Sequence, residues 1–381
     1  MSGSVRHLYV HLPFCARRCG YCDFVTVVGR RGQHEAYVDA LLAELALERD
    51  LLAPGLETVF LGGGTPSFTE PRELERLLAG LPAAPEVTVE ANPETVTLEL
   101  ALLLRASGVN RVSLGVQSFQ PALLRVLDRA AAPKDSRRAF AHLRAAGFDN
   151  VSLDLIYGIP GQSPEQLEAD LAEALALGPE HLSCYELEAK PGTRFTRLHG
   201  EELHRQAAAL EGYFEQVVDL LGAAGYRWYE TANFCRAPAQ AGGRDLRARH
   251  NLAYWRRRDY LGLGIGAVST VGGERWRTTP RLALYLAALA RQERPPRELE
   301  RLSESVQLEE RVLLGLRLDE PLPLAPVSAG LDPAALARLE GLGLARRVRG
   351  GAGSRANGGE ALTLTRRGRL LGGAVTADLL A

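Results

Sequence analysis

Short apolar runs alternate with longer segments of helical periodicity through the first 200 residues. Helix-period segments such as EAYVDALLAELALE (35–48) separate hydrophobic runs that are rich in β-branched side chains. This alternation predicts successive strand–helix units around a parallel sheet. Six units indicate an α/β fold with a partial (β/α)6 TIM-type barrel in place of a complete eight-fold barrel. The six runs are LYVHLPF (8–14), TVFLGG (58–63), EVTVEAN (86–92), RVSLGVQ (111–117), VSLDLIYG (151–158) and HLSCYELE (181–188).

The pattern changes after residue 200. Residues 201–300 contain the glycine-broken apolar segment DYLGLGIGAVSTV, and we expect them to extend the barrel. Later come the helical patterns QLEERVLLGLRL and PAALARLEGLGLA, a Gly/Arg-rich, hairpin-like stretch, and RGRLLGGAVTADLL. We therefore expect a domain boundary at about residue 300. The barrel is expected over 1–200, its extension over 201–300 and a C-terminal helical, winged-helix-like domain over 301–381.

Composition narrows the classes of function. The 381 residues are 46% hydrophobic and carry a net charge of −1, so a large core is expected and a nucleic-acid partner is not. Residues 331–381 hold eight arginines against four acidic residues, fewer than a DNA-recognition surface usually carries. No signal-like run opens the sequence, and no window is long enough to span a membrane. Five cysteines, an odd number, argue against a disulfide framework and favour a reducing cytoplasm.

Three of the cysteines lie close together near the start of the chain. Cys15, Cys19 and Cys22 have the spacing C-x3-C-x2-C, whereas Cys184 and Cys235 stand isolated. A structural zinc site normally closes with four ligands, which this group does not supply. Thiolates are also the preferred ligands of iron–sulfur clusters. Three thiolates on a [4Fe-4S] cluster would leave one iron free to bind another molecule.

With Tyr21 in its aromatic position, the motif resembles the signature of the radical S-adenosylmethionine (SAM) superfamily. The resemblance implies that SAM chelates the open iron and that the reduced cluster cleaves SAM to a 5′-deoxyadenosyl radical. The segment GGGTP (62–66) resembles that superfamily's loop for the SAM amino group. Consecutive glycines let the backbone approach a small polar ligand, although a tight turn alone would also explain them.

Seven segments narrow the resemblance and cover most of residues 8–272. Together they are similar to the family of the oxygen-independent coproporphyrinogen III oxidases and their relatives, the HemW-type heme chaperones. The segments are YVHLPFCARRCGYCDF, FLGGGTPS, VEANPET, RVSLGVQSF, DLIYGIPGQ, LSCYELEAKPGT and HNLAYW. The resemblance implies that SAM is bound by Tyr9, Gly63, Gly64, Thr65, Glu90, Gln117, Arg129 and Asp154.

The chemistry of these residues suits SAM. Carboxylates and an amide can hold ribose hydroxyls and the SAM amine, while Arg129 can meet the SAM carboxylate. Period 2 puts His11 on the same strand face as Tyr9, close to the cluster. His11 is therefore a candidate catalytic hydrogen-bond donor, or else a structural histidine.

Two functions of different classes follow from the resemblance. An oxidase would decarboxylate two propionates of coproporphyrinogen, whereas a chaperone would bind finished heme and transfer it to an acceptor protein, for which we expect a membrane respiratory protein. The oxidases carry an N-terminal extension before the cluster motif and a further cysteine after it. In this sequence the motif starts at Cys15, and Asp23 follows Cys22. Both features favour the chaperone, and another radical SAM reaction is the third alternative.

The segment HNLAYW matches the chaperone group's H-N-x-x-Y-W motif, which offers His250, Asn251, Tyr254 and Trp255 as candidate heme-binding residues. Histidine can ligate heme iron, and aromatic rings can stack on a porphyrin. Alternatively, the aromatic residues pack in a core and His250 is merely polar surface.

Two histidines common in relatives are replaced, by Val268 in the segment GAVS and by Ala131 after Arg129. Neither replacement affects the cluster, but both bear on how heme would be held. The sequence leaves the oligomeric state open.

Overall fold

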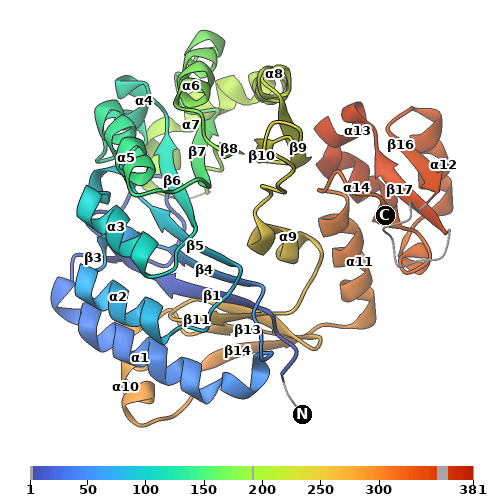
Figure 1. Ribbon diagram of the computed structural model, residues 1–381. Coiled ribbons are helices and arrows are strands. Elements are labelled where there is room, and N and C mark those ends of the chain that lie inside the picture. The colour runs from blue at the N-terminus through green and yellow to red at the C-terminus, as the bar shows by residue number, and fades with distance from the viewer. Residues whose placement is uncertain (1–2, 191–192, 350–358, 381) are drawn as a thin grey trace.

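The computed structural model describes residues 3–190, 193–349 and 359–380. Six parallel strands, neighbours in chain order, form the centre of its main sheet (Figure 1). All six coincide with the apolar runs of the sequence, and they confirm the predicted partial barrel. The strands are β1 (His7–Leu12), β4 (Thr58–Gly63), β5 (Glu86–Ala91), β6 (Arg111–Gln117), β7 (Val151–Tyr157) and β8 (His181–Glu186).

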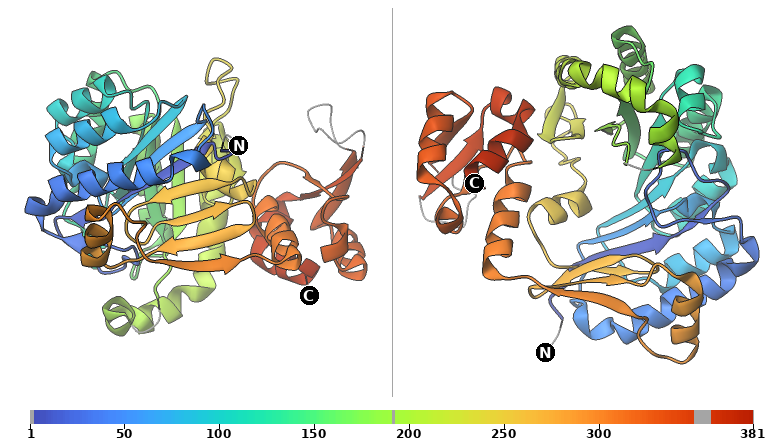
Figure 2. Two further views of the ribbon diagram at one scale, coloured as in Figure 1. Left: turned by 90° about the horizontal axis from the view of Figure 1, so that it is seen from below. Right: turned by 180° about the vertical axis from the view of Figure 1, so that it is seen from behind.

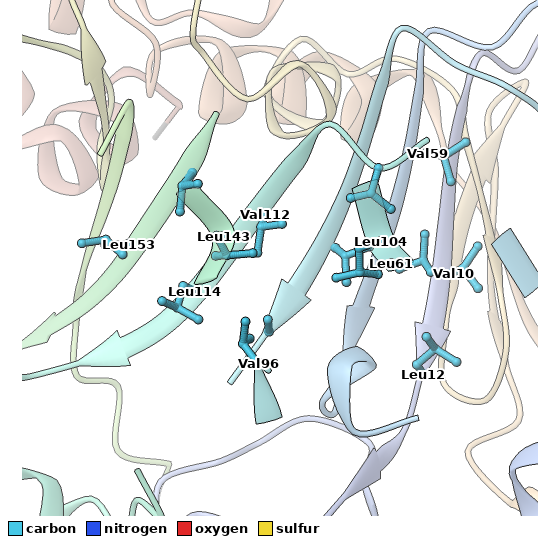
Figure 3. Packing of buried hydrophobic residues seen from close by; sticks show 14 of the residues in the cluster. Val10, Leu12, Val59, Leu61, Val96, Leu104, Val112, Leu114, Leu143 and Leu153 are labelled. Atoms are coloured by element: carbon cyan, nitrogen blue, oxygen red, sulfur yellow. The ribbon is translucent and has the colours of Figure 1, made fainter. Parts of the chain in front are cut away.

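Helices cover the convex face of this sheet (Figure 1). In β1, Leu8, Val10 and Leu12 are fully buried in the main hydrophobic core, so every second residue faces the helices. Figure 3 shows strand residues such as Val10 and Leu114 in this layer. The helices of this layer are α1 (His34–Leu47), α2 (Pro71–Gly80), α3 (Leu98–Ala106), α5 (Pro133–Ala145), α6 (Pro164–Leu177) and α8 (Leu210–Ala223). Two further helices, α4 (Pro121–Val126) and α7 (Arg194–Gln206), contribute Leu123 and Phe195 to a separate small hydrophobic cluster.

The intervening strand residues face the concave side and are largely polar. Tyr9, Glu90 and Asp154 are among them, each one residue away from a buried aliphatic side chain. A barrel interior lined by polar groups can bind a polar ligand, whereas the apolar face stabilises the fold.

Residues beyond 224 lengthen the sheet at both edges, to twelve strands. Beside β8 lie β10 (Asn233–Arg236) and β9 (Tyr226–Glu230), both in antiparallel pairs. Beside β1 lies the parallel strand β11 (Tyr260–Leu263), followed by the antiparallel strands β12 (Val268–Val271), β13 (Glu274–Thr278) and β14 (Arg297–Arg301). Helix α9 (Arg249–Trp255) lies on the concave side, and α10 (Leu282–Ala290) packs on α1 (Figure 2).

The C-terminal segment has its own hydrophobic core, which includes Val312, Leu336, Leu362 and Val375. Its helices and small three-stranded sheet agree with the expected helical, winged-helix-like domain. Its elements are α11 (Glu304–Gly315), β15 (Leu322–Pro323), α12 (Pro333–Gly341), β16 (Ala345–Arg349), β17 (Glu360–Leu364), α13 (Arg366–Leu370) and α14 (Gly372–Leu380).

Two predicted features fall partly outside the described residues: the end of LSCYELEAKPGT at 191–192, and 350–358 in the hairpin-like stretch. The division of the chain at residues 200 and 300 stays a prediction. Among the described residues, no helix combines the length and the apolar character that crossing a membrane requires.

Candidate functional site

A cavity of about 440 Å³ opens at the carboxyl ends of the central strands, where a barrel of this kind carries its chemistry. Its wall brings together residues from five strands or the loops that follow them and from the cysteine loop. Of the predicted residues, those lining it are Cys15, Cys19, Cys22, Gly63, Gly64, Thr65, Glu90, Gln117, Arg129 and Asp154. Tyr9 and His11 lie beneath this wall and are not part of its lining.

Short backbone pairing anchors the cysteine loop. Cys15 ends the two-residue strand β2 (Phe14–Cys15), which pairs with β3 (Val27–Val28) across the base of the loop. Within the loop, the amide of Cys22 donates to the carbonyl of Cys19 at 3.2 Å. The described residues contain no group of three His, Cys, Asp or Glu side chains placed to hold one metal ion. Thiolates that each bind a different iron of a cluster need not converge on one point.

A chain of hydrogen bonds joins two of the cysteines to the strand ends. Thr65 Oγ1 donates to Cys15 Sγ at 3.4 Å, and Asn92 Nδ2 donates to Thr65 Oγ1 at 3.0 Å. Arg129 then donates through Nη2 to Asn92 Oδ1 at 2.9 Å and through Nη1 to Cys19 Sγ at 3.7 Å. The Arg129 guanidinium therefore lies beside the thiol of Cys19 and links the cysteine loop to Asn92 at the end of β5.

The glycine loop is close-packed against its neighbours. Gly63 has φ +111°, and a Cβ there would lie 2.4 Å from Cε1 of His11; one on Gly64 would lie 2.5 Å from the carbonyl oxygen of Pro13. Gly63 also donates its amide to Glu90 Oε2 at 3.0 Å. Gly63 therefore requires glycine for both conformation and space, and Gly64 requires it for space, so GGGTP is more than a generic turn.

His11 has both ring nitrogens engaged below the cavity. Its Nε2 donates to the carbonyl of Val25 at 2.8 Å, so its Nδ1 accepts from the Tyr9 hydroxyl at 3.0 Å. Burial lowers the pKa of His11 to about 4, which keeps the ring neutral. In this arrangement His11 supports the glycine loop from beneath.

Comparison with known proteins identifies the family. The Radical SAM superfamily model matches residues 9–174. The chain is 38% identical to the protein of Mycobacterium tuberculosis named heme chaperone HemW, over 100% of this chain and 96% of that protein. The protein of the same name from Bacillus subtilis is 33% identical over 99% of both chains. The chain belongs to the HemW family.

The fold of this HemW-family chain also resembles a solved enzyme structure. Coproporphyrinogen III oxidase (HemN) from Escherichia coli, described as a radical SAM enzyme, superposes with a TM-score of 0.78. The match covers 100% of this chain and 91% of the oxidase at 23% sequence identity. At that identity the likeness establishes the shared fold.

Two carboxyl groups share the polar wall of this HemW-family cavity. Burial, and then the nearby charge of Asp154, raise the pKa of Glu90 to about 7. Burial likewise raises the pKa of Asp154, although Ser113 Oγ donates to both of its carboxylate oxygens at 3.0 Å. Glu90 can therefore exchange its proton near neutral pH.

We expect this proton to make stability depend on pH. Because the pKa of Glu90 is higher in the folded protein than in the unfolded chain, the folded state binds the proton more tightly. Its contribution to the free energy of unfolding is present below about pH 4.5 and is lost as pH rises through about 7. Glu90→Gln should flatten this decline, measured by denaturant unfolding without SAM, whereas exposed Glu75→Gln should not. An unchanged slope in Glu90→Gln would contradict the assignment.

The H-N-x-x-Y-W residues of this HemW-family chain form helix α9, away from the cysteines. His250 is 1% exposed, and its ring nitrogens bond to Thr58 Oγ1 at 2.7 Å and to the Tyr254 hydroxyl at 2.9 Å. Its backbone amide donates to Glu86 Oε1 at 3.0 Å. Thr58 and Glu86 begin strands β4 and β5, so the motif fastens α9 to the amino ends of the barrel strands. His250 is thus neither exposed polar surface nor free to ligate iron in this conformation.

The structure also places the other residues that the sequence singled out. Asn251, Tyr254 and Trp255 are partly exposed, Ala131 is buried, and Val268 begins strand β12, which lies between β11 and β13. Sequence reasoning missed Asn92 and Ser113, which line the cavity beside the predicted residues. Asn92 stands in the quoted segment VEANPET, and Ser113 precedes Gly115 and Gln117 by period 2, so both carried a usable signal.

Proposed function

We propose that this protein binds heme and transfers it to an acceptor protein, and that its barrel holds a [4Fe-4S] cluster and SAM. One observation carries the proposal: similarity to a protein named heme chaperone HemW extends over 100% of this chain and 96% of that one. A membrane respiratory protein is our candidate for the acceptor.

The donor set of the cavity suits the cluster and SAM. Three cysteine thiols on one loop can supply the thiolates of a cluster, and no fourth cysteine lines the same cavity among the described residues. When bound, the cluster and SAM supply one-electron cleavage chemistry. We assign to Arg129 the positioning of the SAM carboxylate, and to Glu90 and Asp154 the acceptance of hydrogen bonds from its amine or ribose hydroxyls.

The second candidate is radical oxidative decarboxylation of coproporphyrinogen. The fold shared with the E. coli oxidase favours it. Against it stands Asp23 directly after Cys22, where the oxidases carry a further cysteine. The 23% identity to the oxidase is also lower than the 33–39% to the proteins named heme chaperone.

An anaerobic experiment separates the two functions. The reconstituted protein, with its cluster verified by iron and sulfide analysis, is given SAM, a strong reductant and coproporphyrinogen III, and porphyrinogen products are followed by chromatography. We expect no protoporphyrinogen, and in a parallel hemin titration we expect saturable binding seen as a shift of the Soret band. Multiple-turnover formation of protoporphyrinogen would overturn the chaperone in favour of the oxidase.

A further inference from the structure

A second cavity, of about 830 Å³, lies between the open edge of the barrel and the C-terminal segment. Residues of β8, α9, α11 and α14 contribute to its wall. Tyr185, Glu186 and Glu188 line this cavity and the cysteine cavity alike. The two cavities are therefore adjacent, with the end of β8 between them.

Much of the wall is aromatic or aliphatic. Tyr157 and Phe214 come from the barrel, and Leu313 and Leu314 come from α11. Trp255, the last residue of the H-N-x-x-Y-W motif, also lines the cavity, and its buried indole Nε1 has no hydrogen-bond partner among the described residues. A cavity of this size with such a lining suits a large, flat, mostly apolar ligand.

One guanidinium in the wall lacks a carboxylate partner. Arg369 Nη1 donates to the carbonyl of Trp228 at 2.8 Å, while its buried Nη2 has no partner within the described part of the chain. The nearby carboxylates are already engaged, Asp319 by Arg227 at 2.6 Å and Glu230 by Arg317 at 2.7 Å. Burial lowers the pKa of Arg369 to about 10, the effect expected of a desolvated cation that an anion would stabilise.

The start of α14 adds hydrogen-bond donors at the same side. Gly372 and Gly373 form its first turn and line the cavity close to Arg369 in sequence. Amides of a first helical turn have no partner inside their own helix and favour a negative charge. Arg369 and the first turn of α14 thus both line this cavity and both favour an anionic group.

We propose that this second cavity holds heme, with the ring against Trp255 and the leucines of α11 and with the propionates toward Arg369 and the first turn of α14. This inference rests on the proposed function and adds the site at which heme is bound. The carboxylates Glu186 and Glu188 lie on the wall shared with the cysteine cavity, so the propionates point away from them. Trp255, rather than the buried His250, is then the motif residue that meets heme.

The carboxylate contact is tested with protoporphyrin IX and its dimethyl ester, which lacks free carboxylates. In the full-length protein, Arg369→Gln should weaken binding of the diacid about tenfold or more, the scale of losing a charge-assisted hydrogen bond. Binding of the ester should change little. The matched control Arg367→Gln removes an exposed arginine of the same helix and should leave both affinities unchanged. Equal losses for diacid and ester would overturn the contact.

A filling variant tests the location without removing a packed side chain. A Cβ on Gly372 or on the remote Gly341 would meet no atom within 4 Å, and neither glycine has a positive φ. Gly372→Phe should weaken hemin binding about tenfold or more, whereas Gly341→Phe should not. If the unaltered protein binds hemin and Gly372→Phe and Arg369→Gln bind it equally well, this site is wrong and the proposed function stands. Failure of the unaltered protein to bind hemin would overturn the proposed function itself.

Discussion

Replacing Cys19 by serine will prevent assembly of the iron–sulfur cluster. The serine hydroxyl is not ionised at neutral pH and is a poor ligand for iron, so one corner of the cluster loses its thiolate. After anaerobic reconstitution we expect about four irons per chain in the unaltered protein and less than one in Cys19→Ser. Iron and sulfide analysis measures this directly, and the visible charge-transfer absorption should disappear in parallel.

Cys235→Ala is the matched control for this experiment. Cys235 is 1% exposed on β10, in a small hydrophobic cluster distant from the cysteine loop in sequence. Its removal should leave the iron content unchanged, because a buried thiol of this kind behaves as a small apolar side chain. A complete cluster in Cys19→Ser would contradict the assignment of Cys15, Cys19 and Cys22 as its ligands.

Gly63→Ala will strongly destabilise the folded protein. At φ +111° an alanine is strained, and its Cβ would lie 2.4 Å from the ring of His11. That ring is 5% exposed and is held by Val25 and Tyr9, so it has little room to move. Strain and overpacking together should lower the free energy of unfolding by about 3 kcal/mol, measured by denaturant unfolding.

Two further variants make the cause specific. Gly55→Ala introduces the same methyl group where nothing lies within 4 Å and φ is not positive, so it should cost little. Adding His11→Ala to Gly63→Ala removes the clash and leaves the backbone strain. The double variant should therefore lose less stability than the sum of the two single variants. Strict additivity would show that the ring of His11 does not cause the loss.

Much of the fold could be predicted because its signals are local. In β1, hydrophobic Leu8, Val10 and Leu12 alternate with Tyr9 and His11, which is sufficient to predict a strand with one apolar and one polar face. The cysteine spacing and GGGTP could also be recognised from the sequence, because the residues of a short motif are neighbours along the chain. Contacts between distant segments were not readable: Arg129 meets Cys19 across 110 residues, and Asn92 joins Thr65 to that arginine.

The sequence proposed one histidine for catalysis and another for heme binding, but only the tertiary structure shows whether their ring nitrogens are available. A residue type indicates what a side chain can do, but burial and partners decide what remains available to it. His11 and His250 each use both ring nitrogens on other parts of the chain, and burial lowers the pKa of both.

The sequence by itself determined the strand–helix order of the barrel and the family, and it predicted the three cysteine ligands of the cluster. Only the tertiary structure decided which predicted residues share one cavity, that His250 is enclosed, and that Trp255 and Arg369 line a second cavity next to the first. The physical reason is that alternation and motif spacing act over a few residues. A cavity arises where segments more than 100 residues apart leave space between them, as Trp255 and Arg369 do.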